Sequence, residues 1–498
     1  MSVELAMPQN WINERIKTGQ ITKYLDNGKS FIDAESINNA LVVNKSIDRK
    51  QVKDILEKSL SIKTLTLNET GILLNVKDSV ILDEMKETAL KIKKKVYDNR
   101  IVTFAPLYLG SFCVNDCCYC GFRRSNRKAK RRILTLKEIE NEVTILAGHI
   151  GHKRLIAVYG EHPLTDASHI AETLKTIYSV KVKTKNGFGQ IRRVNVNAPP
   201  FSIEELKKIK EAGIGTYQVF QETYHPDTYR MLHPENTIKG NYLWRLYCMH
   251  RALEAGIDDV GLGALFGLYD WKFEVMGLVA HNRELEKKFG IGAHTLSFPR
   301  LEPAANTPFT ENPKHRVSDE YFRKLVLVLR LAVPYVGMII TCRETPQMKR
   351  ESIALGITQT DASSKIGLGA YSEGIEGQDG LRQQFLLADT RSLDEMIREF
   401  AEMGYVTSFC TAGYRCGRTG ECIMELLRSG KEGKFCKLNA VLTFREWLDD
   451  FASAETKKIA EPLLQKEIRE ISIIFPEIYL QFREYYERIA KGERDLYF

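Results

Sequence analysis

The sequence predicts an α/β fold: a (β/α)8 TIM-type barrel that carries an N-terminal helical extension and a C-terminal helical domain. From about residue 101, short runs of β-branched residues alternate with longer amphipathic runs, which is the pattern of a parallel sheet covered by helices. Eight such pairs follow one another over roughly 260 residues, the length that a barrel of this type needs. The chain has 498 residues with 43% hydrophobic content, so it can bury a large core.

Each expected strand is a short run of β-branched and other apolar residues bounded by turn residues. In chain order, the strands are expected at 101–108, 154–159, 192–197, 216–220, 259–264, 293–298, 336–341 and 356–360. Runs of helical period separate them, for example at 136–147, 203–212, 242–255, 271–288 and 318–332. Side chains that follow a strand then lie at the carboxyl end of the barrel, where enzymes of this fold carry out their chemistry.

Three segments are expected along the chain. Residues 1–98 form a charged helical extension without a chemical motif, residues 99–370 form the barrel, and residues 371–498 form a helical domain with a second group of cysteines. The longest apolar run, 325–340, is interrupted by Arg330 and Pro334, well short of the roughly 20 apolar residues that a membrane helix needs. No membrane segment is therefore expected.

Charge and composition exclude some classes of function. The 72 Lys and Arg residues exceed the 64 Asp and Glu residues by 8, a mild excess for this length that does not indicate nucleic-acid binding. The N-terminus opens with Glu4, Pro8 and Gln9 instead of a basic segment before an apolar one, which predicts a cytoplasmic protein. Eight of the ten cysteines gather in two stretches, which in a reducing compartment indicates metal or redox chemistry.

The first group of cysteines follows the first expected strand, in the segment SFCVNDCCYCGF. Cys113, Cys117 and Cys120 have the spacing CxxxCxxC, with Cys118 as an extra residue. Structural zinc is the main alternative, but zinc usually takes four ligands in two pairs, and no second pair lies near in the sequence. Three thiolates on a four-iron four-sulfur cluster instead leave one iron open for a bound molecule.

This segment resembles the radical S-adenosylmethionine (SAM) superfamily, because an aromatic residue, Tyr119, precedes the last cysteine of the motif. The resemblance implies that the open iron binds the amino and carboxylate groups of SAM. One electron then breaks a C–S bond and gives methionine and a 5′-deoxyadenosyl radical. The resemblance also implies that Gly160 and Glu161, after the second strand, contact the SAM amino group, and Tyr119 and Glu222 are expected beside the same cofactor.

Four later segments resemble one subgroup of that superfamily, the tyrosine lyases. They read TYQVFQETYH, HTLSFPRLEPA, VGMIITCRE and SFCTAGYRCGRTGE. The resemblance implies that L-tyrosine is the substrate and that its Cα–Cβ bond breaks to give p-cresol and dehydroglycine. Arg343, after the seventh strand, is expected to hold the tyrosine carboxylate by a bidentate charged pair. The alternative for Arg343 is a surface salt bridge with Glu344, and Ser297 and Arg300 are expected to line the same pocket.

The second group of cysteines distinguishes two branches of the tyrosine lyases. Enzymes of the ThiH type supply dehydroglycine for the thiamine thiazole and lack a second cluster, whereas the HydG maturases of iron-only hydrogenase carry one. The four cysteines of the C-terminal tail favour the maturase branch. That resemblance implies a second iron–sulfur cluster with an extra iron, at which dehydroglycine yields carbon monoxide and cyanide, and implies His281 as the imidazole ligand of this iron.

One position departs from the maturase pattern. The maturases read CTACYR where this chain has Gly413 in place of the middle cysteine, so Cys410 and Cys436 keep only the two outer positions. Glycine cannot bind iron. Three outcomes remain open: the cluster is bound through Cys416, with Cys422 as a further option; the cluster is lost and the chain stops at dehydroglycine; or the site serves another product.

The remaining expectations concern partners. Electron delivery to the first cluster implies a donor such as a ferredoxin or flavodoxin, and the maturase resemblance implies contact with other hydrogenase maturation proteins. Seven of the ten residues from 123 to 132 are basic, which indicates either a solvated loop or a docking site for an acidic electron donor. The rival from another class is a non-catalytic iron–sulfur carrier, which would not cleave SAM.

Overall fold

Eight parallel strands close into a barrel in the computed structural model of the chain, which describes residues 9–43, 48–375, 377–418, 420–429 and 432–498. Each barrel strand pairs with the next, and the last pairs with the first, with Thr103 opposite Thr360. The strands are β1 (Arg100–Gly110), β2 (Arg154–Tyr159), β5 (Arg193–Asn197), β6 (Tyr217–Gln218), β7 (Val260–Gly263), β8 (Thr295–Ser297), β9 (Gly337–Ile340) and β10 (Gln359–Asp361). The predicted fold class is confirmed, and each of the eight predicted strands overlaps an observed one.

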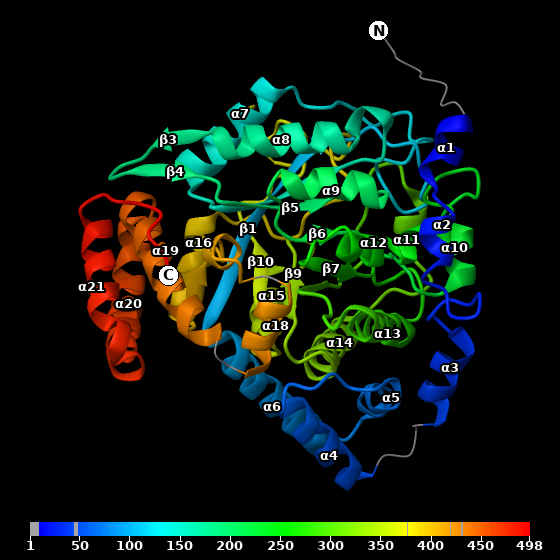
Figure 1. Cartoon of the computed structure of the whole chain (residues 1–498), viewed down its shortest axis with the longest axis horizontal. Helices are drawn as coiled ribbons and strands as arrows, with labels where there is room; N and C mark the ends of the chain where they lie inside the picture. Colours follow the sequence, from blue (N-terminus) through cyan, green and yellow to red (C-terminus); the bar gives the residue numbers. More distant parts are fainter. Residues whose placement is uncertain (1–8, 44–47, 376, 419, 430–431) are drawn as a thin grey trace.

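Helices wrap the outside of the barrel, as Figure 1 shows. One of them, α9 (Ile203–Glu211), begins with a capping box, in which the side chains of Ser202 and Glu205 each accept a hydrogen bond from the backbone N–H of the other. The helices and helical turns between the strands are α7 (Leu136–Thr144), η1 (Ile145–Ile150), η2 (Pro163–Thr165), α8 (Ala167–Ser179), α9, α10 (Pro226–Leu232), α11 (Tyr242–Leu246), α12 (Cys248–Glu254), α13 (Trp271–Phe289), η3 (Pro308–Thr310), α14 (Asp319–Ala332), α15 (Pro346–Ala354) and α16 (Leu393–Glu402).

The helix expected at 242–255 is interrupted at Tyr247, which separates α11 from α12. Arg251 donates to the carbonyl of Trp244 at 2.6 Å and so supplies a donor at the end of α11. The periodicity therefore predicts the helical region correctly but not the break at Tyr247.

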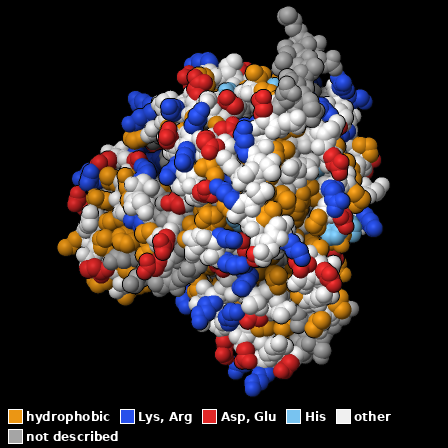
Figure 2. All heavy atoms as spheres, turned by 45° about the vertical axis from the view of Figure 1, so that its right-hand side comes forward, with side chains coloured by type: hydrophobic (Ala, Val, Ile, Leu, Met, Phe, Trp, Pro, Cys, Tyr) orange, Lys and Arg blue, Asp and Glu red, His pale blue; other side chains and the backbone are white. Residues whose placement is uncertain are grey.

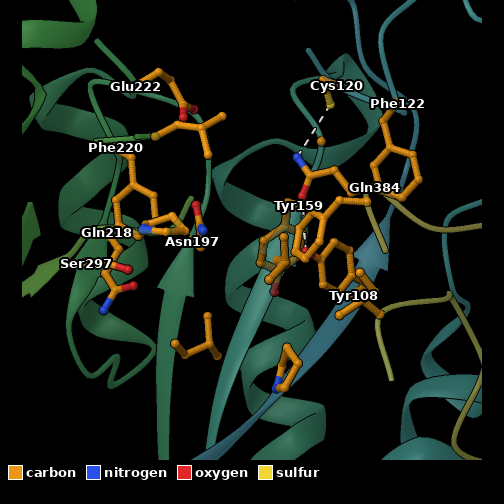
Figure 3. Close-up of a pocket in the computed structure, with 18 of the residues that line it drawn as sticks. Tyr108, Cys120, Phe122, Tyr159, Asn197, Gln218, Phe220, Glu222, Ser297 and Gln384 are labelled. Atoms are coloured by element: carbon orange, nitrogen blue, oxygen red, sulfur yellow. Dashed lines mark hydrogen bonds between the residues drawn. The ribbon is translucent and has the colours of Figure 1, made fainter. Parts of the chain in front are cut away.

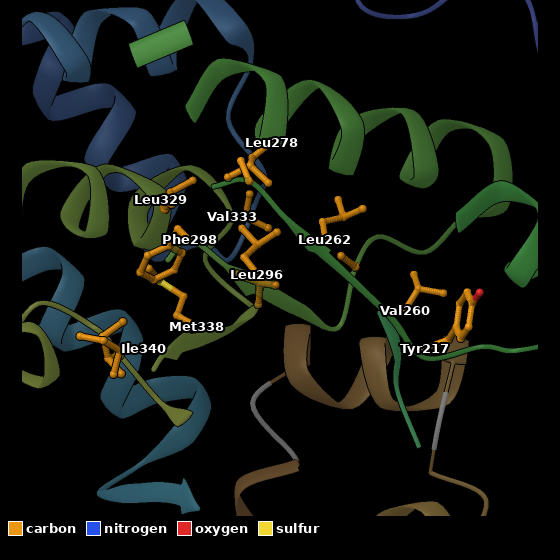
Figure 4. Close-up of a cluster of buried hydrophobic side chains, with 14 of the residues drawn as sticks. Tyr217, Val260, Leu262, Leu278, Leu296, Phe298, Leu329, Val333, Met338 and Ile340 are labelled. Carbon is orange, nitrogen blue, oxygen red and sulfur yellow. The ribbon is translucent and has the colours of Figure 1, made fainter. Parts of the chain in front are cut away.

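The hydrophobic core lies between the outer faces of the strands and the surrounding helices. Figure 4 shows Leu262 of β7, Leu296 of β8 and Met338 of β9 beside Leu278 of α13 and Leu329 of α14. All five side chains are at most 1% exposed. Burying an aliphatic side chain contributes about 1.5–3 kcal/mol to the free energy of folding. This layer therefore fixes the position of the barrel strands.

The described part of the N-terminal segment consists of helices that pack on the outside of the barrel, as predicted. α6 (Ser79–Tyr97) lies against α14, and the backbone N–H of Leu65 donates to the carbonyl of Ala332 at 2.9 Å. These helices are α1 (Gln9–Arg15), α2 (Gly19–Thr22), α3 (Ala34–Val43), α4 (Arg49–Leu60), α5 (Leu67–Asn75) and α6 (Ser79–Tyr97).

A further short strand joins the C-terminal segment to the barrel. β11 (Val406–Ser408) lies parallel to the start of β1, with Val406 opposite Arg100. Periodicity does not predict this strand, because three residues are too few to establish an alternating pattern. Helices α17 (Ala412–Arg415), α18 (Gly420–Ser429), α19 (Glu432–Asp450), α20 (Ala454–Ile474) and α21 (Pro476–Ala490) follow it, and a separate hairpin joins β3 (Lys181–Lys183) to β4 (Phe188–Gln190).

A buried ion cluster also holds α19 to the barrel. Glu446 is fully buried and lies 3.1 Å from the Nζ atom of Lys153 and 2.8 Å from a guanidinium nitrogen of Arg192. Burial would raise the pKa of Glu446, but Arg192 and Lys153 lower it to about 2. The carboxylate is therefore ionised, and removing it would take the carboxylate partner from buried Lys153 and leave Arg192 paired only with Asp495 among the described residues.

The surface carries charges of both signs. On the face shown in Figure 2, Lys and Arg side chains lie interspersed with Asp and Glu side chains. Within the described ranges, no helix combines the length and the apolar character that crossing a bilayer requires.

Candidate active site

A cavity of about 230 Å³ opens at the carboxyl ends of the barrel strands, and it is named the main cavity because the three cysteines of the first motif line it. Figure 3 shows Tyr108 and Tyr159 on one side of it and Asn197, Gln218 and Ser297 on the other. The lining comes from strands around the whole barrel, so closure of the sheet brings residues that are far apart in sequence into one space. In barrels of this type, catalytic groups lie at this end.

Cys113, Cys117 and Cys120 all line this cavity, from the loop that follows β1. The loop is held against the end of β2, because the backbone N–H of Val114 donates to the carbonyl of Glu161 at 2.8 Å. Burial raises the pKa of all three thiols, that of Cys117 to about 11. A bound cationic centre is therefore needed to hold them as thiolates.

Three cysteines on the lining of one cavity are the donor set that a four-iron four-sulfur cluster takes. Among the residues that the structure describes, no three side chains of His, Cys, Asp or Glu converge closely enough to hold one metal ion. In a four-iron cluster each thiolate binds a different iron, so the sulfurs are spread around it. Cys118, the extra cysteine of the motif, does not line the cavity.

The Tyr119 side chain is fixed beside the cysteines by a buried histidine. The Tyr119 hydroxyl lies 2.8 Å from Nε2 of His233, and Nδ1 of His233 lies 2.8 Å from the carbonyl of Tyr229. Burial lowers the pKa of His233, so the ring is neutral. Its Nδ1–H then donates to the carbonyl, and its Nε2 accepts from the tyrosine.

Gly160 and Glu161 directly follow β2 and line the cavity next to the cysteine loop. A Cβ atom on residue 160 would overlap the carbonyl oxygen of Phe112, so this close approach of loop and strand requires glycine. Glu161 is 5% exposed, and its Oε2 accepts from the Asn115 side chain at 2.6 Å, whereas its Oε1 has no hydrogen-bond partner among the described residues. Such an oxygen fits an amino group of a bound molecule.

Glu222 also lines the cavity, in a backbone conformation with a φ of 72° that side-chain-bearing residues rarely adopt. Its carboxylate lies 2.8 Å from Lys239 and 3.2 Å from Arg245. Burial would raise the pKa of Glu222, but these two cations hold it below its ordinary value. The ionised carboxylate can accept hydrogen bonds from hydroxyl groups of a bound molecule.

Arg343 follows β9 and lies on the same cavity wall. Its guanidinium carbon is 3.2 Å from the centre of the Phe385 ring, and its NH1 atom donates a long hydrogen bond, 3.5 Å, to the carbonyl of Arg300. Glu344, the alternative partner of Arg343, instead accepts from Arg300 at 2.9 Å. Most donors of Arg343 are thus available to a ligand in the cavity.

Ser297 lines the cavity from β8, but Arg300 does not. The Arg300 side chain is bound by Glu344 and by Asp319, the latter at 2.7 Å. The structure therefore does not bring Arg300 into the pocket, because two carboxylates hold its guanidinium group elsewhere.

A second cavity, of about 50 Å³, lies at the amino end of the barrel. Cys410, Gly413 and Cys436 line it together with His294, the residue before β8. Cys416 is exposed and does not line this cavity. The structure therefore brings together the two outer cysteines of the maturase pattern but not the proposed replacement for the third.

His281 lies away from this second cavity. It is on α13, where its ring is 5.0 Å from that of Phe31 and its Nδ1 lies 3.0 Å from the hydroxyl of Tyr224. Among the described residues that line the second cavity, the imidazole is that of His294. The expected strand 293–298 was the available signal, because residues at the start of a barrel strand lie at its amino end.

Gln384 and Phe385 complete the main cavity, from the segment after β10, and sequence analysis missed both. The Nε2 atom of Gln384 lies 3.5 Å from the Cys120 sulfur (Figure 3). The two residues are 264 positions apart, and no motif surrounds the glutamine. No signal in the sequence identifies this contact.

Comparisons with known proteins agree with this geometry. Residues 107–276 match the radical SAM superfamily, and residues 297–406 match the Biotin and Thiamin Synthesis associated domain. The chain in a crystal structure of HydG, a maturase of the [FeFe]-hydrogenase, has 45% sequence identity to this chain. The match has a TM-score of 0.88 and covers 94% of this chain and 100% of that chain. HydG from Carboxydothermus hydrogenoformans is 34% identical, with a TM-score of 0.74 over 98% of this chain and 100% of that chain. The 2-iminoacetate synthase of Escherichia coli is 29% identical over 329 residues, which span 66% of this chain and 83% of the enzyme.

Proposed function

The chain belongs to the radical SAM superfamily and, within it, to the family of HydG maturases, and from this premise we propose that it cleaves L-tyrosine by radical chemistry. The proposed reaction breaks the Cα–Cβ bond and gives p-cresol and dehydroglycine. Dehydroglycine is then converted to carbon monoxide and cyanide for the cofactor of iron-only hydrogenase. The observation that carries the proposal is one cavity that holds three cysteines and an arginine with most of its donors available, Arg343.

The cofactors of the superfamily are a four-iron four-sulfur cluster and SAM, which together supply a 5′-deoxyadenosyl radical when bound. Cys113, Cys117 and Cys120 would hold the cluster. Glu161 would accept a hydrogen bond from the amino group of SAM through its unpartnered Oε1, and the ionised Glu222 would accept from hydroxyl groups of the same molecule. Both carboxylates thus bind and orient the cofactor and take no part in bond breaking.

Arg343 is proposed to hold the substrate by its carboxylate. Its planar guanidinium group can give two parallel donors to a carboxylate, a geometry that lysine lacks. The ring of Phe385 supports the guanidinium plane from one face, which fixes its direction before the substrate arrives. Ser297 is proposed to line the same subsite from β8. The substrate is thereby held close to the radical in a space from which the surrounding walls exclude water.

The second cavity is proposed as the place where dehydroglycine is processed. The likeness to HydG extends over 94% of the chain, whereas the match to 2-iminoacetate synthase spans 66%, which favours the maturase role. Cys410 and Cys436 would be two ligands of a second iron–sulfur cluster. For Cys416 to be the third, the short helix α17 would have to rearrange, because Cys416 is exposed at its end. Counting iron in a Cys416→Ala protein tests this ligand, since unchanged iron content excludes it.

A ferredoxin or flavodoxin is proposed as the electron donor. Arg124, Arg127 and Lys128 are exposed beside the cysteine loop, where they would attract an acidic partner. Arg131, from the same basic run, instead donates to the carbonyl of Phe122 at 2.7 Å and supports the loop. The rate of cluster reduction by the donor should fall as ionic strength rises.

A Lys128→Gln variant should slow that reduction, whereas Lys94→Gln, an exposed lysine on α6, serves as the matched control. A reduction rate that changes neither with ionic strength nor with either substitution would contradict the docking site.

One anaerobic assay tests the proposed function against its rivals. The protein is reconstituted with iron and sulfide, given SAM, tyrosine and dithionite, and assayed for 5′-deoxyadenosine, p-cresol and carbon monoxide. All three products support the maturase function. Formation of p-cresol without carbon monoxide would favour a ThiH-like lyase, and absence of 5′-deoxyadenosine would favour the non-catalytic iron–sulfur carrier.

A further inference from the structure

We propose that Gln384 tunes the reduction potential of the iron–sulfur cluster by donating a hydrogen bond from its side-chain amide to the sulfur of Cys120. It is a positioning residue, because it acts on the cluster through a ligand and does not touch the substrate. The inference rests on the cluster assigned to the three cysteines of the main cavity, and it does not depend on which substrate is cleaved.

Two contacts fix the direction of the Gln384 amide. Its Nε2 lies 3.5 Å from the Cys120 sulfur, and its Oε1 lies 3.1 Å from the hydroxyl of Tyr108. A cysteine sulfur that binds a cluster carries no proton and can only accept, so the amide turns its N–H group to Cys120 and leaves Oε1 to accept from the Tyr108 hydroxyl. Figure 3 shows the three side chains in this order on one wall of the cavity.

The backbone of the same segment is attached to the cysteine loop. The N–H of Gly121, the residue after Cys120, donates to the carbonyl of Gln384 at 3.2 Å. A Cβ atom on residue 121 would lie 2.7 Å from that carbonyl oxygen and 3.0 Å from the carbonyl oxygen of Gln383. The close approach therefore requires glycine at position 121, and it keeps the Gln384 side chain within reach of the sulfur.

Among the described side chains, the Gln384 amide is the nearest donor recorded for a sulfur of the three cysteines. The Asn115 amide lies farther from the Cys113 sulfur, 3.7 Å, and also donates to Glu161 at 2.6 Å. The shorter bond of Asn115 goes to the carboxylate, whereas Cys120 is the nearest acceptor recorded for the N–H group of Gln384.

A hydrogen bond to a cluster thiolate changes the reduction potential. Reduction adds negative charge to the cluster and its sulfur ligands, and an N–H donor stabilises the more negative state. Gln384 should therefore raise the potential and make the cluster easier to reduce. Because the bond is formed by a side chain, it can be removed without changing the three ligands.

The test is a redox titration of the reconstituted full-length protein, followed by the electron paramagnetic resonance signal of the reduced cluster and without tyrosine turnover. In Gln384→Leu, a variant of similar size without the donor, the ratio of reduced to oxidised cluster at a fixed potential should fall about tenfold, a shift of about 59 mV for one electron. The matched control is Gln383→Leu, which changes the neighbouring glutamine and should leave the ratio unchanged. Equal potentials in wild type and Gln384→Leu, at equal iron content, would overturn the proposal.

A second variant keeps the test decisive if Gln384→Leu binds less iron. Tyr108→Phe keeps the ring but removes the hydroxyl that orients the amide, so the potential should shift in the same direction by a smaller amount. An unchanged potential in Tyr108→Phe would then overturn the proposal. Neither readout requires p-cresol formation, so failure of the tuning role is distinguishable from failure of the lyase function.

Discussion

Replacing Arg343 by lysine should weaken tyrosine use while leaving the fold intact. Within the described residues, the guanidinium group donates only the long 3.5 Å hydrogen bond to the Arg300 carbonyl and stacks on the Phe385 ring, so the substitution removes few contacts from the folded protein. A bidentate pair with the substrate carboxylate comprises two charged hydrogen bonds, each contributing about 1.5–3 kcal/mol. Lysine keeps the positive charge but can donate only one of the two hydrogen bonds to the substrate carboxylate. Loss of one bond corresponds to roughly a 10- to 150-fold fall in kcat/KM for tyrosine.

The assay measures p-cresol and 5′-deoxyadenosine over a range of tyrosine concentrations, with the iron content of each protein determined first. Arg300→Lys is the matched control, because Arg300 lies at the same end of the barrel but is bound by Glu344 and Asp319 and does not line the cavity. It should leave the KM for tyrosine near the wild-type value. Normal tyrosine affinity in Arg343→Lys would refute the carboxylate role.

Three further changes test other parts of the molecule. Gly413→Cys should raise the iron content after reconstitution, because it adds a thiol beside Cys410 and Cys436, and the nearest atom to a Cβ at this position is 3.6 Å away. The control is Gly413→Ser, and an iron content equal to that of Gly413→Cys would contradict the prediction. Glu446→Gln should lower the free energy of unfolding in urea at pH 7 by about 3–5 kcal/mol. Because the folded pKa of Glu446, about 2, lies below its ordinary value of 4.5, this stabilisation is present above pH 4.5 and is lost as pH falls toward 2, so the difference from wild type should shrink over that window. Leu296→Ala should cost about 2–5 kcal/mol and lower the Tm, whereas Leu480→Ala, at a side chain 84% exposed, should change stability by less than about 0.5 kcal/mol.

Much of the barrel could be predicted because buried parallel strands leave a strong pattern in the sequence. The expected strand 154–159 coincides with β2, whereas the expected strand 216–220 is reduced to Tyr217–Gln218 in β6. An apolar run indicates which residues are buried, but backbone hydrogen bonds to the neighbouring strands decide where a strand ends. The same limit explains β11, whose three residues are defined by pairing with β1 and not by their own composition.

The candidate site was predictable where spacing along the chain carries the chemistry. The three cysteines of the first motif were expected together, and they line one cavity. Arg300 and Arg343 could not be separated by sequence, because the difference between them is which one Glu344 binds. His281 and His294 could not be separated by motif, since only the three-dimensional structure gives the end of the barrel to which each side chain belongs.

The length of β1 has a consequence for how the two cysteine-lined cavities work together. Near one end of this strand, Val102 lies opposite Ser408, two residues before Cys410; at the other end, Gly110 leads into the cysteine loop. The eight residue steps from Val102 to Gly110 span about 26 Å. If the proposed clusters bind at both cavities, this separation is too long for rapid electron transfer between them, so each cluster would need its own supply of electrons. Apolar side chains from β1, β2 and β9 (Phe104, Ile156 and Ile339) form a cluster on the lining of the main cavity, so a molecule that leaves this cavity toward the amino end of the barrel would meet an apolar surface.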